Sequence, residues 1–226
     1  MRGQPFFKRV TPQLYGQKGK IDMQKAMNIS YEIGNKLYLN ITNKCPCNCT
    51  FCIRNNGDGA YGSDPLWLEH QPSIDEVIAN LKTRDLDSYE EIIFCGYGEP
   101  TCELEILKTT AAYIRSVSKT PIRLNTNGLG NLVNKRDIAP DFEGLLDTVS
   151  VSLNASDSEA YDKVTRPSFK GVDCFEEMLK FAERVKLFVP NAMLTVVDVI
   201  GEEEIAKSQA IADKVGIQLR VREYEA

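Results

Sequence analysis

Short β-branched, apolar runs alternate with helix-length segments from residue 36 onward. This alternation is typical of repeated βα units, in which a helix joins each strand to the next parallel strand. The helical segments carry start signals, including a capping box of Ser73 and Glu76 and an Asp173 three residues before Glu176. The pattern predicts six strands, at residues 36–42, 91–94, 121–125, 148–153, 192–199 and 217–222.

Polar and apolar residues alternate within these predicted strands. At residues 148–153, for example, Ser150 and Ser152 alternate with valines. Successive side chains of a strand point to opposite faces, so we expect one face under helices and one polar face. Parallel strands buried on both faces would be continuously apolar. The pattern therefore predicts a wet, concave cavity. An antiparallel sheet with one solvent face would also alternate, but the connections have the length of parallel crossovers.

The predicted fold class is α/β, and six βα units favour a partial (βα)6 TIM-like barrel over a closed eight-stranded one. No linker or repeat divides residues 36–226, which we expect to form the core domain. Residues 1–35 are predicted to be a basic N-terminal arm or extension, since the first 26 positions hold six basic residues and one acidic residue. We expect a solvated arm, with contact to a nucleic acid or another anionic partner as the alternative.

Composition narrows the functional classes. The chain has 226 residues, 42% of them hydrophobic, which is enough for a core without disulfide staples. A formal net charge of -5 argues against non-specific nucleic-acid binding by the whole domain. Its apolar runs are too short to cross a membrane. Seven cysteines without an apolar leader favour a reducing, cytoplasmic location over a secreted disulfide framework.

Four of the cysteines lie within residues 45–52, and three of them have the spacing C-x3-C-x2-C. Thiolates at Cys45, Cys49 and Cys52 could hold one face of a cuboidal iron–sulfur cluster and leave the fourth iron open to another ligand. Cys47 is the extra thiol of this loop. We interpret it as unligated, with a regulatory thiol and an alternative ligand as the other interpretations.

Small and polar residues also follow the other predicted strands. In parallel α/β folds, the loops at the carboxyl ends of the strands carry the chemistry. The second strand leads into residues 95–101, Cys-Gly-Tyr-Gly-Glu-Pro-Thr, and the third and fourth lead into residues 125–128 and 152–155. These residue types also make ordinary turns, but their concentration at one edge of the sheet indicates a site.

The cysteine loop, with Phe51 before its last cysteine, and the Gly-x-Gly-Glu-Pro segment together resemble the radical S-adenosylmethionine (SAM) superfamily. The resemblance covers roughly residues 36–224. It implies a 4Fe-4S cluster on Cys45, Cys49 and Cys52, with SAM on the open iron. The resemblance further implies SAM contacts from Phe51, Tyr97, Gly98 and Glu99 and, by position at the strand ends, from Asn125, Asn127, Ser152 and Asn154.

The resemblance also implies a reaction. An electron from the cluster would cleave SAM to a 5'-deoxyadenosyl radical, which abstracts a hydrogen atom from the substrate, while the protein supplies position and excludes water. The electron donor would be a protein such as flavodoxin or ferredoxin. Residues 37–43 and 53–59 are similar to the small radical SAM proteins associated with TatD-family nucleases.

Several residues are candidates for the substrate side of the site. Residues 55–71 form a long, Gly-rich segment with the sole tryptophan, Trp67, and predict a lid over the cluster. His70, the only histidine, is expected in a solvated loop. Cys95 could donate a hydrogen atom in the cavity, although such a cysteine is more often a small buried hydrophobe.

Arg123, Arg220 and Arg222 have the strand parity of the polar face. Guanidinium groups there would suit a carboxylate or phosphate, with ion pairs to Asp198, Glu99 or Glu223 as the alternative role. We therefore expect a small, polar, anionic substrate. Two alternatives stay open: a glycyl-radical activase that acts on a partner protein, and an iron–sulfur electron-transfer or scaffold protein without SAM chemistry.

Overall fold

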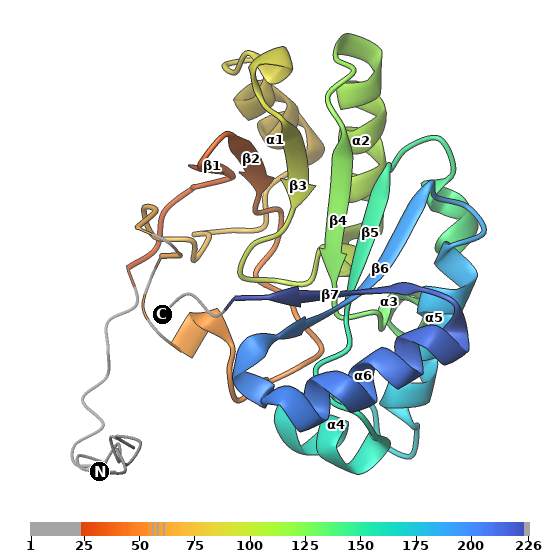
Figure 1. The fold of residues 1–226 in the computed structure, drawn as a ribbon. Coiled ribbons are helices and arrows are strands. Elements are labelled where there is room, and N and C mark those ends of the chain that lie inside the picture. The colour runs from red at the N-terminus through yellow and green to blue at the C-terminus, as the bar shows by residue number, and fades with distance from the viewer. Residues whose placement is uncertain (1–23, 56, 58, 61, 224–226) are drawn as a thin grey trace, which may run out of the picture.

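The computed structural model describes residues 24–55, 57, 59, 60 and 62–223. Within them, a sheet of seven strands is flanked by six α-helices (Figure 1). The strands are β1 (Ser30–Ile33), β2 (Lys36–Leu39), β3 (Glu91–Phe94), β4 (Ile122–Thr126), β5 (Thr148–Ser152), β6 (Asn191–Val197) and β7 (Gln218–Arg222). The helices are α1 (Ile74–Leu81), α2 (Leu104–Val117), α3 (Gly130–Asn134), α4 (Ser158–Thr165), α5 (Cys174–Val185) and α6 (Glu202–Val215). Most of the predicted basic arm lies outside the described residues.

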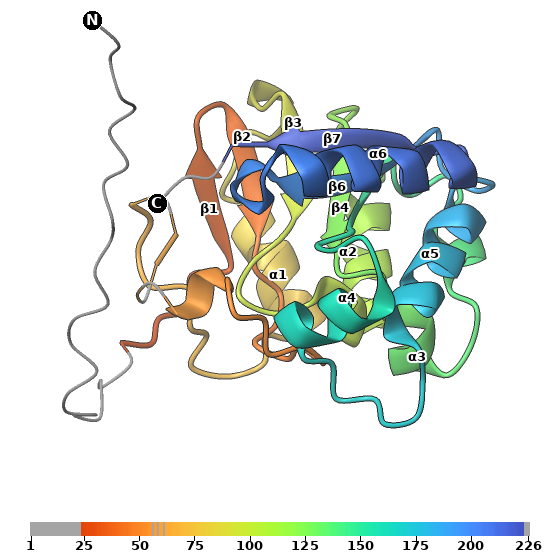
Figure 2. The same ribbon diagram turned by 60° about the horizontal axis from the view of Figure 1, so that its bottom comes forward.

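The sequence of the strands across the sheet identifies the architecture. The order is β1 to β7 without a crossover, and every pair from β2 to β7 is parallel. A doubly wound sheet would reverse its strand order at a switch point and carry helices on both faces. In (βα) barrels, by contrast, each strand lies next to the one before it in the chain, and the helices all cover the same face of the sheet. The predicted α/β partial barrel is confirmed. Figure 1 shows the resulting twist, with β7 lying steeply across β4 and β5, and Figure 2 shows α6 alongside β7.

The six predicted strands form β2 to β7, and the predicted helix starts are present. The Ser73 side chain accepts a hydrogen bond from the Glu76 amide, while the Glu76 carboxylate accepts one from the Ser73 amide, which completes the capping box of α1. Asp173 caps α5 by accepting from the Glu176 amide. None of the helices in the described ranges combines the length and apolar character that a membrane-spanning helix needs.

One strand was not predicted. β1 pairs antiparallel with β2 through a tight turn at Gly34, whose φ of +57° favours glycine. The sheet thus begins at Ser30, within the segment that the sequence analysis assigned to the arm. Gly34-Asn35 between two short β runs is a two-residue hairpin signal that could have predicted this strand.

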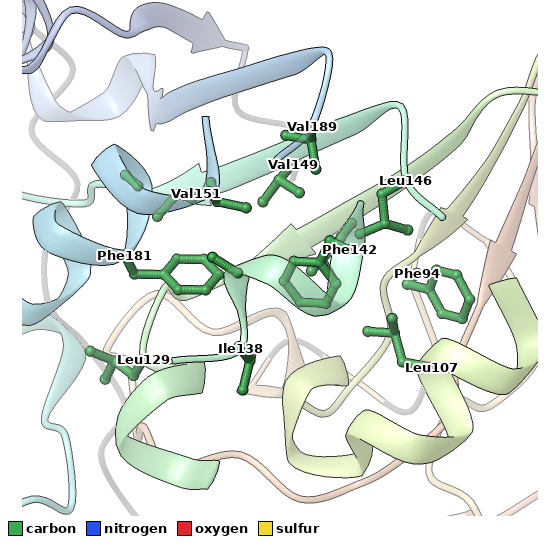
Figure 3. Close-up of a cluster of buried hydrophobic side chains, with 14 of the residues drawn as sticks. Phe94, Leu107, Leu129, Ile138, Phe142, Leu146, Val149, Val151, Phe181 and Val189 are labelled. Carbon is green, nitrogen blue, oxygen red and sulfur yellow. The ribbon is translucent and has the colours of Figure 1, made fainter. Parts of the chain in front are cut away.

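The apolar face of the sheet forms the core with the helices. Leu37, Ile92 and Ile122 pair in register across β2, β3 and β4, and each side chain is fully buried. Figure 3 shows the part of this core where Phe142 and Phe181 meet beside Val149 and Val151. The two rings pack edge to face, with centroids 6.5 Å apart. This burial fixes the helices on one face and leaves the other face of the sheet to polar side chains.

Truncation of one buried aromatic side chain should lower the stability of the fold. Phe181→Ala should reduce the free energy of unfolding by about 3–5 kcal/mol, because a fully buried ring is lost and leaves a cavity. Leu187→Ala is the matched control: that side chain is 64% exposed, and its loss should cost no more than about 0.5 kcal/mol. Urea denaturation of the two variants checks this, and equal losses would contradict the assigned core.

Candidate functional site

The predicted polar residues share the concave face of the sheet. Asn125 pairs with Ser150 between β4 and β5, and Thr195 of β6 pairs with Ser152 on one side and Arg220 on the other. On β4, β5 and β6, their strand neighbours on the opposite face are buried, whereas Val221, next to Arg220 on β7, is 45% exposed. Ser150 is only 4% exposed, and its hydroxyl has no hydrogen-bond partner among the described residues. A buried hydroxyl of this kind lacks the partner that most buried polar groups have in native structures.

The cysteine loop leaves the carboxyl end of β2 and is held at its far side by the segment that ends α4. The amide of Asn48 donates to the Thr165 carbonyl at 3.0 Å, and the amide of Thr50 donates to the Val164 carbonyl at 2.9 Å. Cys47 and Pro167 form an isolated antiparallel bridge between the same two segments. Backbone hydrogen bonds therefore tie the loop to a segment that lies far along the chain, at the end of α4.

The thiols of this loop have unequal acidity. Hydrogen bonding from Cys47 lowers the pKa of Cys45 to about 7 and also lowers the pKa of Cys49. The same hydrogen bonds raise the pKa of Cys47, which keeps its proton and is only 4% exposed. Arg54 Nε donates to Cys52 Sγ at 3.2 Å. Both shifts act in favour of the thiolate, which is the form that binds metal.

The donor set fits an iron–sulfur cluster by its chemistry. The loop offers three sulfurs at the C-x3-C-x2-C positions, two of them with a lowered pKa and one hydrogen-bonded to a cation. Among the described residues, no three His, Cys, Asp or Glu side chains already converge as metal ligands do. The Cys47 thiol, which hydrogen-bonds to both Cys45 and Cys49, lies between two of the sulfurs.

The segment 95–101 lies directly against the start of the cysteine loop. A Cβ atom at Gly98 would overlap the carbonyl oxygen of Thr42 and lie 2.7 Å from that of Lys44. At Gly96, a Cβ atom would overlap the Asn40 side chain. The Glu99 amide donates to the Lys44 carbonyl at 2.7 Å. The two glycines are therefore needed for backbone approach, and they bring Glu99 beside the cysteines.

Glu99 is buried and its carboxylate is fixed by four donors. Oε1 accepts from the Thr101 amide at 3.1 Å, the Thr101 hydroxyl at 2.8 Å and the Thr126 hydroxyl at 2.7 Å, and Oε2 accepts from the Asn127 amide at 2.8 Å. Burial raises the pKa of Glu99, against the opposing effect of these hydrogen bonds. Because a carboxylate has about four lone-pair sites, Oε2, which accepts one hydrogen bond against three at Oε1, is the oxygen with room for a further donor.

Asn127 links this carboxylate to the cysteines. Its side-chain amide lies 3.9 Å from Cys45 Sγ and 3.7 Å from Cys47 Sγ, while its backbone amide binds Glu99. The structure thus brings together three of the residues predicted from separate loops. Asn154, at the end of β5, has a left-handed φ of +62°, a conformation that asparagine adopts more readily than most residues.

The other residues predicted for the site differ in how deeply they are buried. Tyr97 is buried, and its hydroxyl donates to the carbonyls of Gly57 and Gly59 at 2.8 and 2.9 Å. Phe51 is 46% exposed at the surface of the loop. Burial raises the pKa of Cys95, which lies within reach of Asn125 and the charge of Arg222, so its thiol stays protonated near neutral pH.

The predicted lid packs on the residues after β2. Leu66 and Leu68 are buried, and their carbonyls accept from the side-chain amides of Asn40 and Asn43, both at 2.8 Å. Trp67 stacks edge to face on Tyr97, with ring centroids 5.2 Å apart. His70 is exposed, as expected, and pairs with Glu76 at 2.8 Å.

The three arginines predicted on the polar face differ in whether they form an ion pair. Arg123 is bound through two nitrogens by Glu91 at 2.7–2.8 Å, a partner that the sequence analysis did not name. The alternative of ion pairs to Asp198, Glu99 or Glu223 is therefore wrong for Arg123, and its charge is already neutralised for any substrate. Arg220 and Arg222 are exposed on β7, in the rows of Thr195 and Val197, and form no ion pair within the described residues.

Comparison with known proteins shows the family to which the chain belongs. The model of the radical SAM superfamily matches residues 39–210. The chain belongs to the radical SAM superfamily. That family binds a 4Fe-4S cluster and SAM, and its members are enzymes, so both cofactors and the enzyme class apply to this chain.

The relatives are distant. A stretch of 154 residues, 66% of this chain, is 27% identical to the GTP 3',8-cyclase of Rhodococcus opacus strain B4 and covers 40% of it. Over 139 residues, 59% of the chain, identity to the GTP 3',8-cyclase of Corynebacterium glutamicum strain ATCC 13032 is 33%, covering 34% of that protein. The chain thus spans well under half the length of these relatives. The crystal structure of methylornithine synthase shares the fold at a TM-score of 0.51 and 12% identity, over 84% of this chain and 53% of that one.

Three residues of the site had no role in the sequence analysis. Thr101 and Thr126 fix Glu99, and Arg54 binds Cys52. A cation two positions after the last cysteine was a usable signal for Arg54. Thr126 lies on the apolar parity of β4, so a hydroxyl at the end of that strand was a signal too.

Because Cys49 is an expected cluster ligand and Cys47 is not, their substitutions should differ in how much iron and sulfide the protein retains. Cys47→Ala should keep the iron and sulfide content of the anaerobically reconstituted protein near that of the wild type, because Cys47 is not one of the three cysteines of the C-x3-C-x2-C motif. Cys49→Ala should lose most of it, since only two ligands would remain. Iron and sulfide analysis decides: a collapse in Cys47→Ala as complete as in Cys49→Ala would show that the ligand assignment is wrong.

The fixed carboxylate predicts a second pair of variants. Glu99→Gln would place an NH2 group where the carboxylate now accepts hydrogen bonds, so one surrounding N–H or O–H donor would lose its acceptor. The substitution should lower the free energy of unfolding by about 1–3 kcal/mol and weaken SAM binding. Glu103→Gln is the control in the same loop: it loses an ion pair to the exposed Lys44, worth under about 1 kcal/mol. Denaturation and equilibrium SAM binding measure both effects, and SAM affinity that falls equally in both variants would contradict the role of Glu99.

Proposed function

We propose that this chain is a radical SAM enzyme that acts on a small, polar, anionic substrate on the concave face of the sheet. The observation that carries the proposal is the direct packing of the segment 95–101 on the cysteine loop, with Glu99 fixed by four hydrogen bonds beside the thiols. When bound, the cluster and SAM would supply the 5'-deoxyadenosyl radical that abstracts a hydrogen atom from the substrate.

The residues of the chain would position and enclose this chemistry. Cys45, Cys49 and Cys52 would hold the cluster, and Glu99 Oε2 and the backbone of Gly98 would hold the SAM amine. Asn127, Ser152 and Asn154 would meet the ribose and carboxylate from the strand ends. Since radical transfer depends on the placement of the reacting atoms, the fixed carboxylate matters more for geometry than for proton transfer.

Charge on β7 supports the anionic character of the substrate. Arg220 lies in the row of Ser152 and Thr195, and Arg222 is near enough to influence the pKa of Cys95. Two guanidinium groups without ion pairs among the described residues suit a carboxylate or phosphate. The relatives are named for a nucleoside triphosphate, which is an anion of this kind.

We further propose that the chain belongs with the small radical SAM proteins associated with TatD-family nucleases, on the likeness of residues 37–43 and 53–59, and that a flavodoxin or ferredoxin supplies the electron. The cysteine loop is partly exposed at Cys45, Cys49 and Cys52, which allows such a donor to approach. No feature of the described residues favours a glycyl-radical activase or an electron carrier over this enzyme.

Product analysis tests the function. The reconstituted protein with SAM and dithionite, kept anaerobic, should form 5'-deoxyadenosine above the level of the Cys49→Ala variant. Small carboxylates and phosphate esters should raise that rate further, whereas neutral sugars and amides should not. Formation equal to that of Cys49→Ala would reject the function, and stimulation by neutral compounds alone would reject the anionic substrate.

A further inference from the structure

The side chain of Arg54 is held on three sides next to the cysteine loop. It belongs to the 3-10 turn Ile53–Asn55, which begins directly after Cys52. Its Nε donates to Cys52 Sγ at 3.2 Å, its Nη2 donates to the Cys47 carbonyl at 3.3 Å, and its Cζ lies 5.7 Å from the centroid of the Trp67 ring. A long, flexible side chain with three such contacts has one defined position.

Among the residues that the structure describes, the charge of Arg54 has no carboxylate partner. No Asp or Glu of the described residues forms an ion pair with it, in contrast to Arg84, Arg115, Arg123, Arg136 and Arg184. A cation that is partly withdrawn from water is stabilised by negative charge and hydrogen-bond acceptors close by. The sulfurs of the cysteine loop are the groups that supply it, since Cys52 accepts directly and the charge of Arg54 also reaches Cys45 and Cys49.

We propose that Arg54 sets the reduction potential of the cluster by stabilising its reduced form. The inference rests on the proposed function, in which Cys52 is a cluster ligand. One-electron reduction by a flavodoxin- or ferredoxin-type donor adds one negative charge and neither forms nor breaks a bond. A guanidinium in contact with a ligand sulfur stabilises that added charge and raises the potential, by hydrogen bonding to sulfur and by its field.

Trp67 is the positioning residue for Arg54. Its ring lies under the guanidinium and also packs edge to face with Tyr97, and Tyr97 belongs to the segment that carries Glu99. The contacts thus run from the SAM-side loop through two aromatic rings to a cluster ligand. A lysine at position 54 would keep the charge but lose the planar fork that donates to sulfur and carbonyl while stacking on an indole.

Potentiometric titration followed by EPR tests the inference on the reconstituted protein. Arg54→Gln should lower the midpoint potential by about 59 mV, which corresponds to a tenfold smaller equilibrium constant for one-electron reduction. Arg54→Lys should lower it less. Trp67→Leu should shift it in the same direction, because the guanidinium is no longer held against Cys52. Lys119→Gln, which removes an exposed charge from the loop before β4, is the control and should leave the potential unchanged.

A second readout needs no cluster. Trp67 is the only tryptophan, so its emission reports the guanidinium contact in metal-free protein. Arg54→Gln should move the emission maximum to longer wavelength, because water replaces the cation over the ring, and Lys119→Gln should not move it. An unchanged maximum in Arg54→Gln would overturn the packing on which the inference rests.

The outcomes separate this inference from the proposed function. Wild-type iron content with an unchanged midpoint potential in Arg54→Gln overturns the role of Arg54 and leaves the function standing. If Arg54→Gln loses its iron, Arg54→Lys and Trp67→Leu decide, and potentials equal to the wild type in both overturn the inference. A wild-type protein that assembles no cluster rejects the proposed function instead.

Discussion

The site depends on one close contact between two backbones. Residues 96–99 lie so near residues 40–44 that Gly96 and Gly98 leave no room for a Cβ atom, and the Glu99 amide donates to the Lys44 carbonyl at 2.7 Å. The next residue after Lys44 is the first thiol of the cysteine loop. A contact that excludes side chains fixes Glu99 relative to the thiols with the accuracy of main-chain packing, which flexible side chains would not provide.

The one-way winding of the sheet explains why this contact can serve chemistry. Since strands β1 to β7 follow each other without reversal, the helices lie on the apolar face and the carboxyl ends of the parallel strands share one edge. Thr126 and Asn127 then reach Glu99 from the end of β4. The core in Figure 3 supplies the rigid support. Within the described part of the chain, the Ser150 hydroxyl on the polar face has no hydrogen-bond partner and the two arginines of β7 form no ion pair.

Much of this could be predicted from the sequence, because period and capping are local properties. The alternation of Ser150 and Ser152 with valines was sufficient to place one face of β5, and the Ser73 capping box was sufficient to start α1. Ion-pair partners were not predictable in this way. Glu91 binds Arg123 only because β3 and β4 pair in a particular register, and parity alone does not give register.

The same limit applies to the hydrogen bonds of the site. Spacing identified Cys45, Cys49 and Cys52, but the contact of Arg54 with both Cys52 and Trp67 depends on how residues 62–71 fold back over the loop. The four donors on Glu99 likewise come from two separate segments, Thr101 and the end of β4 at residues 126–127. Such networks arise from tertiary packing, which a pattern of residue types does not encode one pair at a time.

We propose that the cysteine loop and the Glu99 segment form one site, in which SAM binds at the cluster. The most direct measurement is the EPR spectrum of the dithionite-reduced, reconstituted protein before and after addition of SAM. The account predicts that SAM changes the cluster signal in the wild type, and that Glu99→Gln keeps the signal while needing more SAM for the change. A wild-type spectrum that saturating SAM leaves unaltered would contradict it.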